Sequence, residues 1–278
     1  DFHKNINNYR NTKFKLFLKY LLDNGTAILN DNIKSIDKLK NELVKTNIKI
    51  ITYGKNNSDI NCSFYKNKIR LKIYKKNYVL KYKAVNTYEL YNLSCAIGCS
   101  IAMGLTVSEI VKNVPKITKV EGRMQLVDNL YNGAKIFVDY AHTPDALKNI
   151  LKSNTKNNKK PDLVFGCGGD RDKSKRKIMG IIANKYANSV YITDDNPRSE
   201  NPVSIRKSIF LKCKKAINIE DRRKAIKLAI NNLKAKSILI IAGKGHEKKQ
   251  IFKNKAVTFD DVKIAKTIIN TINANAYK

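Results

Sequence analysis

The feature that most constrains the fold is a regular alternation of short apolar runs and amphipathic stretches in the second half of the chain. The strand-like runs are residues 162–166, 190–193 and 238–243. The helix-like stretches lie near residues 175–188, 203–216, 221–234 and 260–273. Buried apolar strands that alternate with helices are typical of a parallel, doubly wound α/β sheet. Ahead of them, residues 124–140 predict a hairpin, because an Asn-Gly pair separates two strand-like runs.

The first 120 residues show a more mixed pattern. Helical spacing of apolar side chains predicts helices at residues 4–22, 34–45 and 87–103, and a Ser/Thr-capped helix at 106–114. Short strands are expected at 26–29 and 48–53, and the alternation from Cys62 to Val85 predicts an antiparallel pair around residues 75–77. The change of pattern near residue 120 predicts a domain boundary there, with domains at 1–120 and 121–278.

The charge of the chain indicates no specific partner. Lys and Arg number 55 against 23 Asp and Glu, which gives a formal net charge of +32. The lysines are spread over the whole length without a recognition-helix or stacking-aromatic motif, so we expect only unspecific, salt-sensitive attraction to nucleic acids. A basic nucleic-acid-binding protein remains an alternative. No apolar run approaches the ~20 residues of a membrane span, and five cysteines without metal-ligand spacing fit a reducing cytoplasm.

Four polar motifs directly follow expected strands. They are "DYAHTPDA" after Val138, "GCGGDRDKSKR" after Phe165, "DDNPRSENP" after Thr193 and "GKGHEKKQ" after Ala242. Alone, "GKGHE" is typical of a glycine turn with a solvated lysine, and "GCGGDRD" lacks the G-x-x-x-x-G-K-[ST] spacing of a phosphate loop. The carboxyl ends of parallel strands lie along one edge of a sheet, where ligands bind. We therefore expect the four motifs to form one binding site.

These motifs, together with "DFH", "NYRNTKFKLF" and "EGRM", resemble the Mur ligases of peptidoglycan synthesis, in order from residue 1 to beyond 260. The resemblance is strongest to the branch that adds meso-diaminopimelate to UDP-N-acetylmuramoyl-L-alanyl-D-glutamate. It implies that residues 1–120 are the second half of a central ATP-binding domain. It implies that residues 121–278 are a Rossmann-like C-terminal domain that binds the incoming amino acid. The implied activity is that of an ATP-dependent amide ligase of cell wall biogenesis, acting in the cytoplasm and needed for cell shape and division.

The resemblance also implies roles for individual residues. Those implied for meso-diaminopimelate are Arg171, Asp195, Asn196, Pro197, Arg198, Gly243 and Glu247. Those implied for ATP are Asn92, Arg123, Asp139 and His142. Magnesium is expected at His3 and Lys13, with the lysine carbamylated so that a cation becomes an oxygen ligand. The chemistry of Arg198 agrees, since a planar guanidinium offers paired donors to a carboxylate.

Some features of the family pattern are absent or altered. The uridine-binding N-terminal domain and the Gly-Lys-Thr/Ser phosphate loop do not occur in the sequence, so we expect an N-terminally truncated ligase that is inactive alone. Glu89, Gln125 and Lys177 replace the family's usual Asn, Glu and Pro. A lysine-adding sister ligase and folylpolyglutamate synthetase remain alternatives, although the tetrapeptide 195–198 argues against both. The expected partners are ATP, UDP-muramoyl-dipeptide and meso-diaminopimelate, with no membrane, no specific nucleic acid and a monomeric state.

Overall fold

The computed structural model describes residues 5–82, 84, 86–155 and 157–276. The chain divides into two compact units, which we call unit 1 (Asp1–Thr118) and unit 2 (Lys119–Lys278). Within the described part of the chain, no helix combines the length and the apolar character that crossing a membrane requires.

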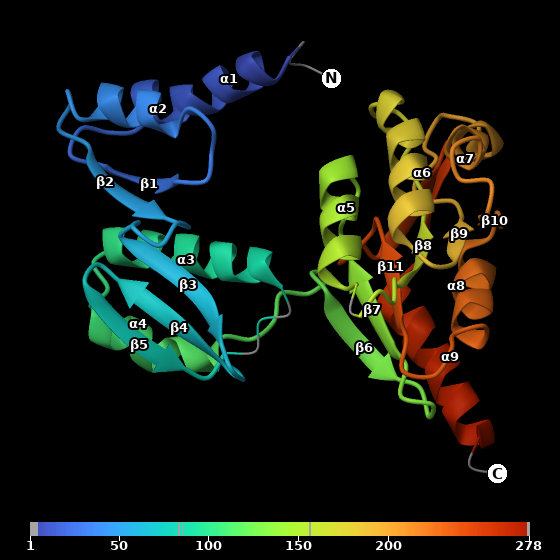
Figure 1. The fold of residues 1–278 in the computed structure, drawn as a ribbon. Helices are drawn as coiled ribbons and strands as arrows, with labels where there is room; N and C mark the ends of the chain where they lie inside the picture. The colour runs from blue at the N-terminus through green and yellow to red at the C-terminus, as the bar shows by residue number, and fades with distance from the viewer. Residues whose placement is uncertain (1–4, 83, 85, 156, 277–278) are drawn as a thin grey trace. The chain divides into compact units, whose positions relative to one another are not determined.

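Unit 1 is built on a five-stranded mixed sheet with the strand order β1-β2-β3-β4-β5 (Figure 1). Its strands are β1 (Thr26–Asn30), β2 (Lys49–Tyr53), β3 (Ile60–Tyr65), β4 (Lys68–Ile73) and β5 (Lys76–Leu80). The first three run parallel, and β3, β4 and β5 form an antiparallel meander. The antiparallel pair predicted around residues 75–77 is confirmed as β4 and β5, with Ile73 opposite Lys76.

Helices cover both faces of the unit 1 sheet, as consecutive side chains of β1 show. Ile28 packs with helix α3 (Thr87–Ala102), whereas Leu29 packs with helix α2 (Ile36–Leu43) and with partly buried side chains of helix α1 (Ile6–Lys19). Helix α4 (Val107–Asn113), which precedes a 3₁₀ turn (Val114–Lys116), begins with the predicted cap, a capping box between Thr106 and Glu109.

Unit 2 is the doubly wound sheet that the alternation predicts, with the strand order β10-β9-β8-β11-β7-β6. Its strands are β6 (Gln125–Asn129), β7 (Lys135–Asp139), β8 (Asp162–Phe165), β9 (Val190–Ile192), β10 (Ile217–Asn218) and β11 (Ile238–Ala242). Neighbouring strands run parallel except for β6 and β7, which form the predicted antiparallel hairpin. The four strands that precede the polar motifs therefore end at one edge.

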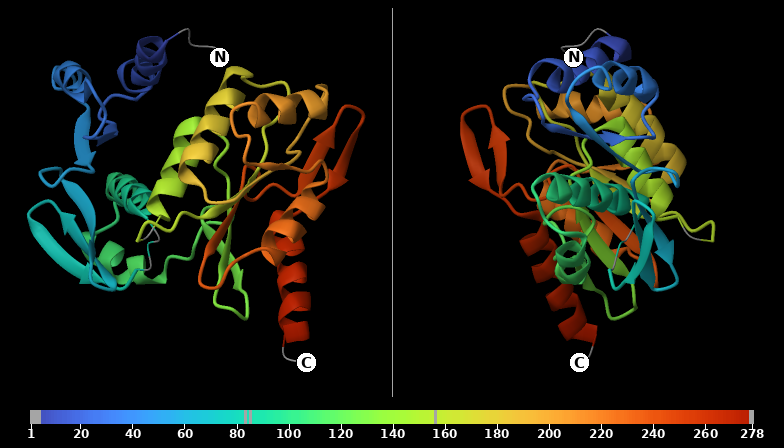
Figure 2. Two further views of the ribbon diagram at one scale, coloured as in Figure 1. Left: turned by 45° about the vertical axis from the view of Figure 1, so that its right-hand side comes forward. Right: turned by 90° about the vertical axis from the view of Figure 1, so that its left-hand side faces the viewer.

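Two groups of helices sandwich this sheet (Figures 1 and 2). One face carries α5 (Pro144–Ser153), α6 (Ser174–Tyr186) and α7 (Pro202–Phe210), and the other carries α8 (Arg222–Asn231) and α9 (Asp261–Ala276). Neighbouring residues of β8 serve both faces, since Phe165 packs in the first cluster and Val164 in the second. Helix α7 is shorter than the predicted 203–216, because the chain turns after Phe210 and buries Cys213 and Ala216.

A two-stranded hairpin that the sequence did not predict follows β11. It consists of β12 (Lys249–Phe252) and β13 (Lys255–Thr258), which pair only with each other as a sheet, and it stands apart from the main sheet in Figure 2. The chain leaves β7 and β8 toward α5 and α6 on one face, but it leaves β11 toward this hairpin and α9 on the other. Since β11 lies between β7 and β8, the edge around its carboxyl end is a topological switch point, where ligands bind in open α/β sheets.

Candidate functional site

Four loops leave the carboxyl edge of the unit 2 sheet. We call them the β7 loop (140–143), the β8 loop (166–173), the β9 loop (193–201) and the β11 loop (243–248). Every residue predicted to hold meso-diaminopimelate lies in the last three of these loops, and the His142 predicted to contact ATP lies in the first.

Glycines let the β8 and β9 loops touch through their backbones. A Cβ atom on Gly169 would lie 1.9 Å from the Pro197 carbonyl oxygen, and a Cβ atom on Gly166 would lie 2.2 Å from that of Thr193. The Gly169 N–H donates to the Asn196 carbonyl oxygen over 2.9 Å. Only residues without a side chain permit this approach, so the glycines of "GCGGD" serve loop packing.

The carboxylate of Glu200 clamps the same two loops together. It accepts hydrogen bonds from Arg176 over 2.8 and 3.0 Å and from the Asp170 N–H over 2.6 Å. The hydrogen bond from Arg176 is the main reason that the pKa of Glu200 falls from 4.5 to about 2. Asp170 in turn accepts from the hydroxyl and the N–H of Ser199 over 2.5 and 3.1 Å. The two loops therefore form one cross-linked surface.

Arg171 and Arg198 meet on this surface next to Gly168. A Cβ atom on Gly168 would lie 2.8 Å from Nη1 of Arg198 and 3.9 Å from Cγ of Arg171. Arg198 is half-buried, has a φ of 52° and donates Nη1 to the Gly169 carbonyl oxygen over 2.8 Å. Arg171 is exposed and donates to the Asp170 carbonyl oxygen over 2.9 Å. Neither guanidinium makes a further hydrogen bond to a residue that the structure describes, so both keep donors for a carboxylate ligand.

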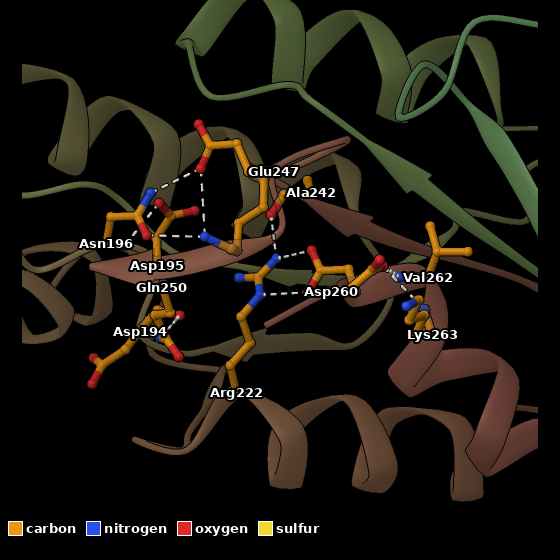
Figure 3. Close-up of polar contacts among 12 residues, drawn as sticks. Asp194, Asp195, Asn196, Arg222, Ala242, Glu247, Gln250, Asp260, Val262 and Lys263 are labelled. Atoms are coloured by element: carbon orange, nitrogen blue, oxygen red, sulfur yellow. Dashed lines mark hydrogen bonds and ion pairs between the residues drawn. The ribbon is translucent and has the colours of Figure 1, made fainter. Parts of the chain in front are cut away.

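A second group of polar side chains lies on the β9 and β11 loops and contains amide and carboxylate oxygens (Figure 3). Asn196 donates Nδ2 to Oε2 of Glu247 over 2.9 Å, and the ammonium of Lys244 donates to Oδ1 of Asn196 over 2.9 Å. Asp195 reaches the same place, since a Cβ atom on Gly243 would lie 2.6 Å from its Oδ2. Gly243 also has a φ of 115°. Glycine is therefore favoured at this position both by the lack of space for a Cβ atom and by the backbone conformation. The structure thus brings together all seven residues predicted to bind meso-diaminopimelate.

A buried ion pair holds the carboxyl end of β11 in place (Figure 3). The guanidinium of Arg222 donates Nε and Nη2 to the Asp261 carboxylate over 2.8 and 2.7 Å, and Nη2 also donates to the Ala242 carbonyl oxygen over 3.0 Å. Both side chains are 0% exposed. Since Arg222 begins α8, Asp261 begins α9 and Ala242 ends β11, this pair locks three elements at the base of the β11 loop.

The residues predicted to contact ATP in unit 2 gather around Tyr140. The guanidinium of Arg123 lies 4.7 Å from the Tyr140 ring centroid, and the rings of His142 and His246 lie 4.6 and 5.3 Å away. Arg123 and both histidines are exposed. Asp139 is buried and accepts from the N–H groups of Met124 and Ala141 over 2.7 Å each. Their role in nucleotide binding stays a prediction.

The predicted site residues of unit 1 have fewer partners. Lys13 is exposed on α1 with its ammonium 5.5 Å from the Tyr9 ring centroid, and Asn92 is exposed on α3. His3 lies outside the described residues. Among the described residues no group of three or more His, Cys, Asp and Glu side chains could hold a metal ion. An unmodified lysine ammonium repels a divalent cation, so Lys13 would fit magnesium only as a carbamate.

Three charged residues of this site were missed by sequence reasoning. The interpretation of "GKGHE" as a turn with a solvated lysine is wrong for Lys244, which is 0% exposed. Its position between two glycines directly after an all-apolar strand was a usable signal. Arg176 and Glu200 carried no such signal, because their pairing joins a helix to a loop 24 residues away.

Comparisons with known proteins agree with this architecture. The family model for the Mur ligase middle domain matches residues 1–100, and the model for the Mur ligase glutamate ligase domain matches residues 122–245. The chain belongs to the Mur ligase family. Within it, the UDP-N-acetylmuramoyl-L-alanyl-D-glutamate--2,6-diaminopimelate ligase of Rickettsia montanensis is 40% identical over 278 residues, which cover 97% of this chain and 57% of that protein. The chain thus spans little more than half the length of this relative.

Solved structures show the same relationship. One, described as the structure of UDP-N-acetylmuramoyl-L-alanyl-D-glutamate--2,6-diaminopimelate ligase, has 30% sequence identity and a TM-score of 0.58, covering 97% of this chain and 57% of that one. Folylpolyglutamate synthase of Mycobacterium tuberculosis has a TM-score of 0.62 at 15% identity, covering 78% of this chain and 52% of that one, which shows a common fold alone.

Proposed function

We propose that this protein acts in the ATP-dependent addition of meso-diaminopimelate to UDP-N-acetylmuramoyl-L-alanyl-D-glutamate, in the cytoplasm, during peptidoglycan synthesis. The names of its relatives support this proposal. The single observation that carries it is the meeting, on one edge of unit 2, of two arginines that keep donors with an amide and carboxylate pair, Asn196 and Glu247. In this proposal residues 1–120 are part of a central ATP-binding domain and residues 121–278 bind the amino acid.

The charges of the site complement this amino acid. Meso-diaminopimelate has an ammonium and a carboxylate at each end. The planar guanidinium groups of Arg171 and Arg198 suit its carboxylates, since each presents paired donors. The carboxylate of Glu247, which is 32% exposed, suits an ammonium group. Pro197 is buried and stiffens the loop between these groups, so that less conformational entropy is lost on binding.

The proposed reaction has two stages. ATP phosphorylates the D-glutamate carboxylate to give an acyl phosphate, and the neutral amine of diaminopimelate attacks the acyl carbon. The tetrahedral intermediate then loses one proton of the attacking amine to water and expels phosphate, which leaves the amide. Asn92, Arg123, Asp139 and His142 are the residues we propose for ATP binding, and Lys13, as a carbamate, with His3 for magnesium. The part of this chain that carries the proposal is unit 2, whose loops hold the attacking amino acid.

Binding to the amino acid tests the proposal directly. Isothermal titration calorimetry on the 278-residue chain should show tighter binding of meso-diaminopimelate than of L-lysine, which lacks the second carboxylate. Losing a charge-assisted contact costs roughly 2–4 kcal/mol, so we expect a difference of at least about 30-fold. Arg198→Ala should remove this preference, whereas Arg223→Ala, an exposed arginine of the same unit, should keep it. Equal affinities for the two amino acids would contradict the proposal.

A further inference from the structure

We propose that Lys244 is a positioning residue, which orients the Asn196 amide and one oxygen of the Glu247 carboxylate so that the other oxygen receives the ammonium of the incoming amino acid. This inference rests on the function proposed above. Lys244 itself is 0% exposed, so a ligand in solvent cannot contact it directly. It therefore acts through its neighbours.

The ammonium of Lys244 has three N–H donors and meets three acceptors. They are Oδ1 of Asn196 at 2.9 Å, the Lys249 carbonyl oxygen at 2.6 Å and Oε2 of Glu247 at 3.4 Å. These acceptors come from the β9 loop, from β12 and from the β11 loop. Burial of a charge is costly unless it is paired and hydrogen-bonded, and here every donor has a partner. One buried lysine thus joins the three segments that surround the site.

The contacts of Lys244 decide which way the Asn196 amide points. Its Oδ1 accepts from the Lys244 ammonium and also from the Ile251 N–H over 3.0 Å. A flipped amide would direct its NH₂ group at these two donors and lose both hydrogen bonds. The Nδ2 atom is therefore left to donate to Oε2 of Glu247 over 2.9 Å. Lys244 fixes the amide, and the amide fixes the carboxylate.

The result is a carboxylate with one occupied and one available oxygen. Oε2 of Glu247 receives donors from Asn196 and Lys244, whereas Oε1 accepts no hydrogen bond from any residue that the structure describes. The side chain is 32% exposed, so a ligand can reach it. A fixed acceptor of this kind loses little entropy when an ammonium binds, which is the advantage of preorganisation.

A double-mutant cycle on the 278-residue chain tests the inference, with calorimetric titration of meso-diaminopimelate as the measurement. Lys244→Met and Glu247→Gln should each weaken binding about 10- to 100-fold. If Lys244 acts through Glu247, the double variant should bind no more than about 3-fold more weakly than Glu247→Gln alone, because residues in one network are not additive. Lys248→Met, the exposed neighbour, should bind as the unsubstituted protein does. Additive losses, or undiminished binding by Lys244→Met, would overturn the inference.

A second cycle covers the case in which Lys244→Met does not fold. Asn196→Asp keeps an acceptor for the buried lysine but removes the NH₂ group that holds Glu247. Asn196→Asp should weaken binding on its own, but it should cause little further loss of affinity when combined with Glu247→Gln. If Asn196 instead contacted the ligand directly, the losses of affinity from the two substitutions would add. Unchanged binding by Asn196→Asp would also refute the inference that Lys244 acts on Glu247 through Asn196. If the unsubstituted chain does not bind meso-diaminopimelate at all, the proposed function fails, and that outcome is separate from binding that is indifferent to these substitutions.

Discussion

The two units hold their predicted site residues in different ways. In unit 1, Lys13 and Asn92 are exposed side chains on helix surfaces, and α1, which carries Lys13, has no fully buried residue among those described. In unit 2, the residues predicted to bind the amino acid belong to loops joined by the glycine contacts, by Glu200 and by Lys244. The predicted amino-acid site is therefore shaped by unit 2 itself, whereas the described part of unit 1 gives the side chains of Lys13 and Asn92 neither a hydrogen bond nor an ion pair.

Because of this difference, substitutions of the predicted site residues should affect the stability of the two units to different extents. Behind the unit 2 loops lie buried charges, and a buried charge that loses its partner destabilises the fold strongly. An exposed side chain on a helix contributes little to stability. Substitutions in the two units should accordingly differ most in the free energy of unfolding.

The largest effect is expected from Arg222→Met. This change leaves the Asp261 carboxylate buried without its partner and frees the carbonyl oxygen at the end of β11. We expect a loss of about 3–5 kcal/mol in the free energy of unfolding of unit 2, measured by urea denaturation with circular dichroism. Arg223→Met, the adjacent exposed arginine, is the matched control and should change stability by less than about 0.5 kcal/mol. Similar values for the two variants would show that the buried pair does not hold this edge together.

An intermediate effect is expected from Glu200→Gln, which weakens the clamp between the β8 and β9 loops. At neutral pH the loss should be about 1.5–3 kcal/mol, the usual value for a hydrogen bond to a charged group. The pKa of Glu200 is lowered from 4.5 to about 2, so its carboxylate stabilises the fold above pH 4.5 and loses this contribution as the pH falls toward 2. The difference in unfolding free energy between the unsubstituted protein and the variant should shrink over that range.

Urea denaturation between pH 6.5 and pH 3 measures this difference. Glu42→Gln, an exposed glutamate of unit 1, is the control and should leave the unfolding of unit 2 unchanged at every pH. If the difference in unfolding free energy between the unsubstituted protein and Glu200→Gln stays constant down to pH 3, the contact with Arg176 does not depend on the charge of the carboxylate.

The fold was largely predictable because burial leaves a mark on the sequence. The buried strands of unit 2 are continuous apolar runs, and the hairpin of β6 and β7 has its Asn-Gly turn. The hairpin of β12 and β13 has no such mark. All four residues of β13 are exposed, and lysines occupy both strands, so neither apolar alternation nor a turn signal distinguishes them from a loop.

The site was predictable only in part, for a related reason. Motif order predicted a site at Arg171, Arg198 and Glu247, and the parallel strands bring their loops to one edge. The buried partners that hold them were not predictable in the same way. A lysine in a chain this rich in lysine is expected in solvent, and only three acceptors from three segments make the burial of Lys244 tolerable. Such a set of contacts exists only once the fold has formed.

The smallest effect on stability is expected at Lys13, and it sharpens the contrast between the units. The side chain is exposed and its ammonium lies 5.5 Å from the centroid of the Tyr9 ring, so Lys13→Ala should change the free energy of unfolding by less than about 0.5 kcal/mol. Lys15→Ala, an exposed lysine of the same helix, is the control and should behave alike. If Lys13 acts as a carbamate, the two variants should differ in one respect only. Ligation should nearly vanish in Lys13→Ala and should return in part when short-chain carboxylates are added. It is measured as phosphate release in a preparation that carries the activity, supplied with both substrates, ATP and magnesium. Equal ligation by the two variants would make Lys13 an ordinary surface lysine, and a large loss of stability in Lys13→Ala would mean that α1 packs more tightly than its exposure indicates.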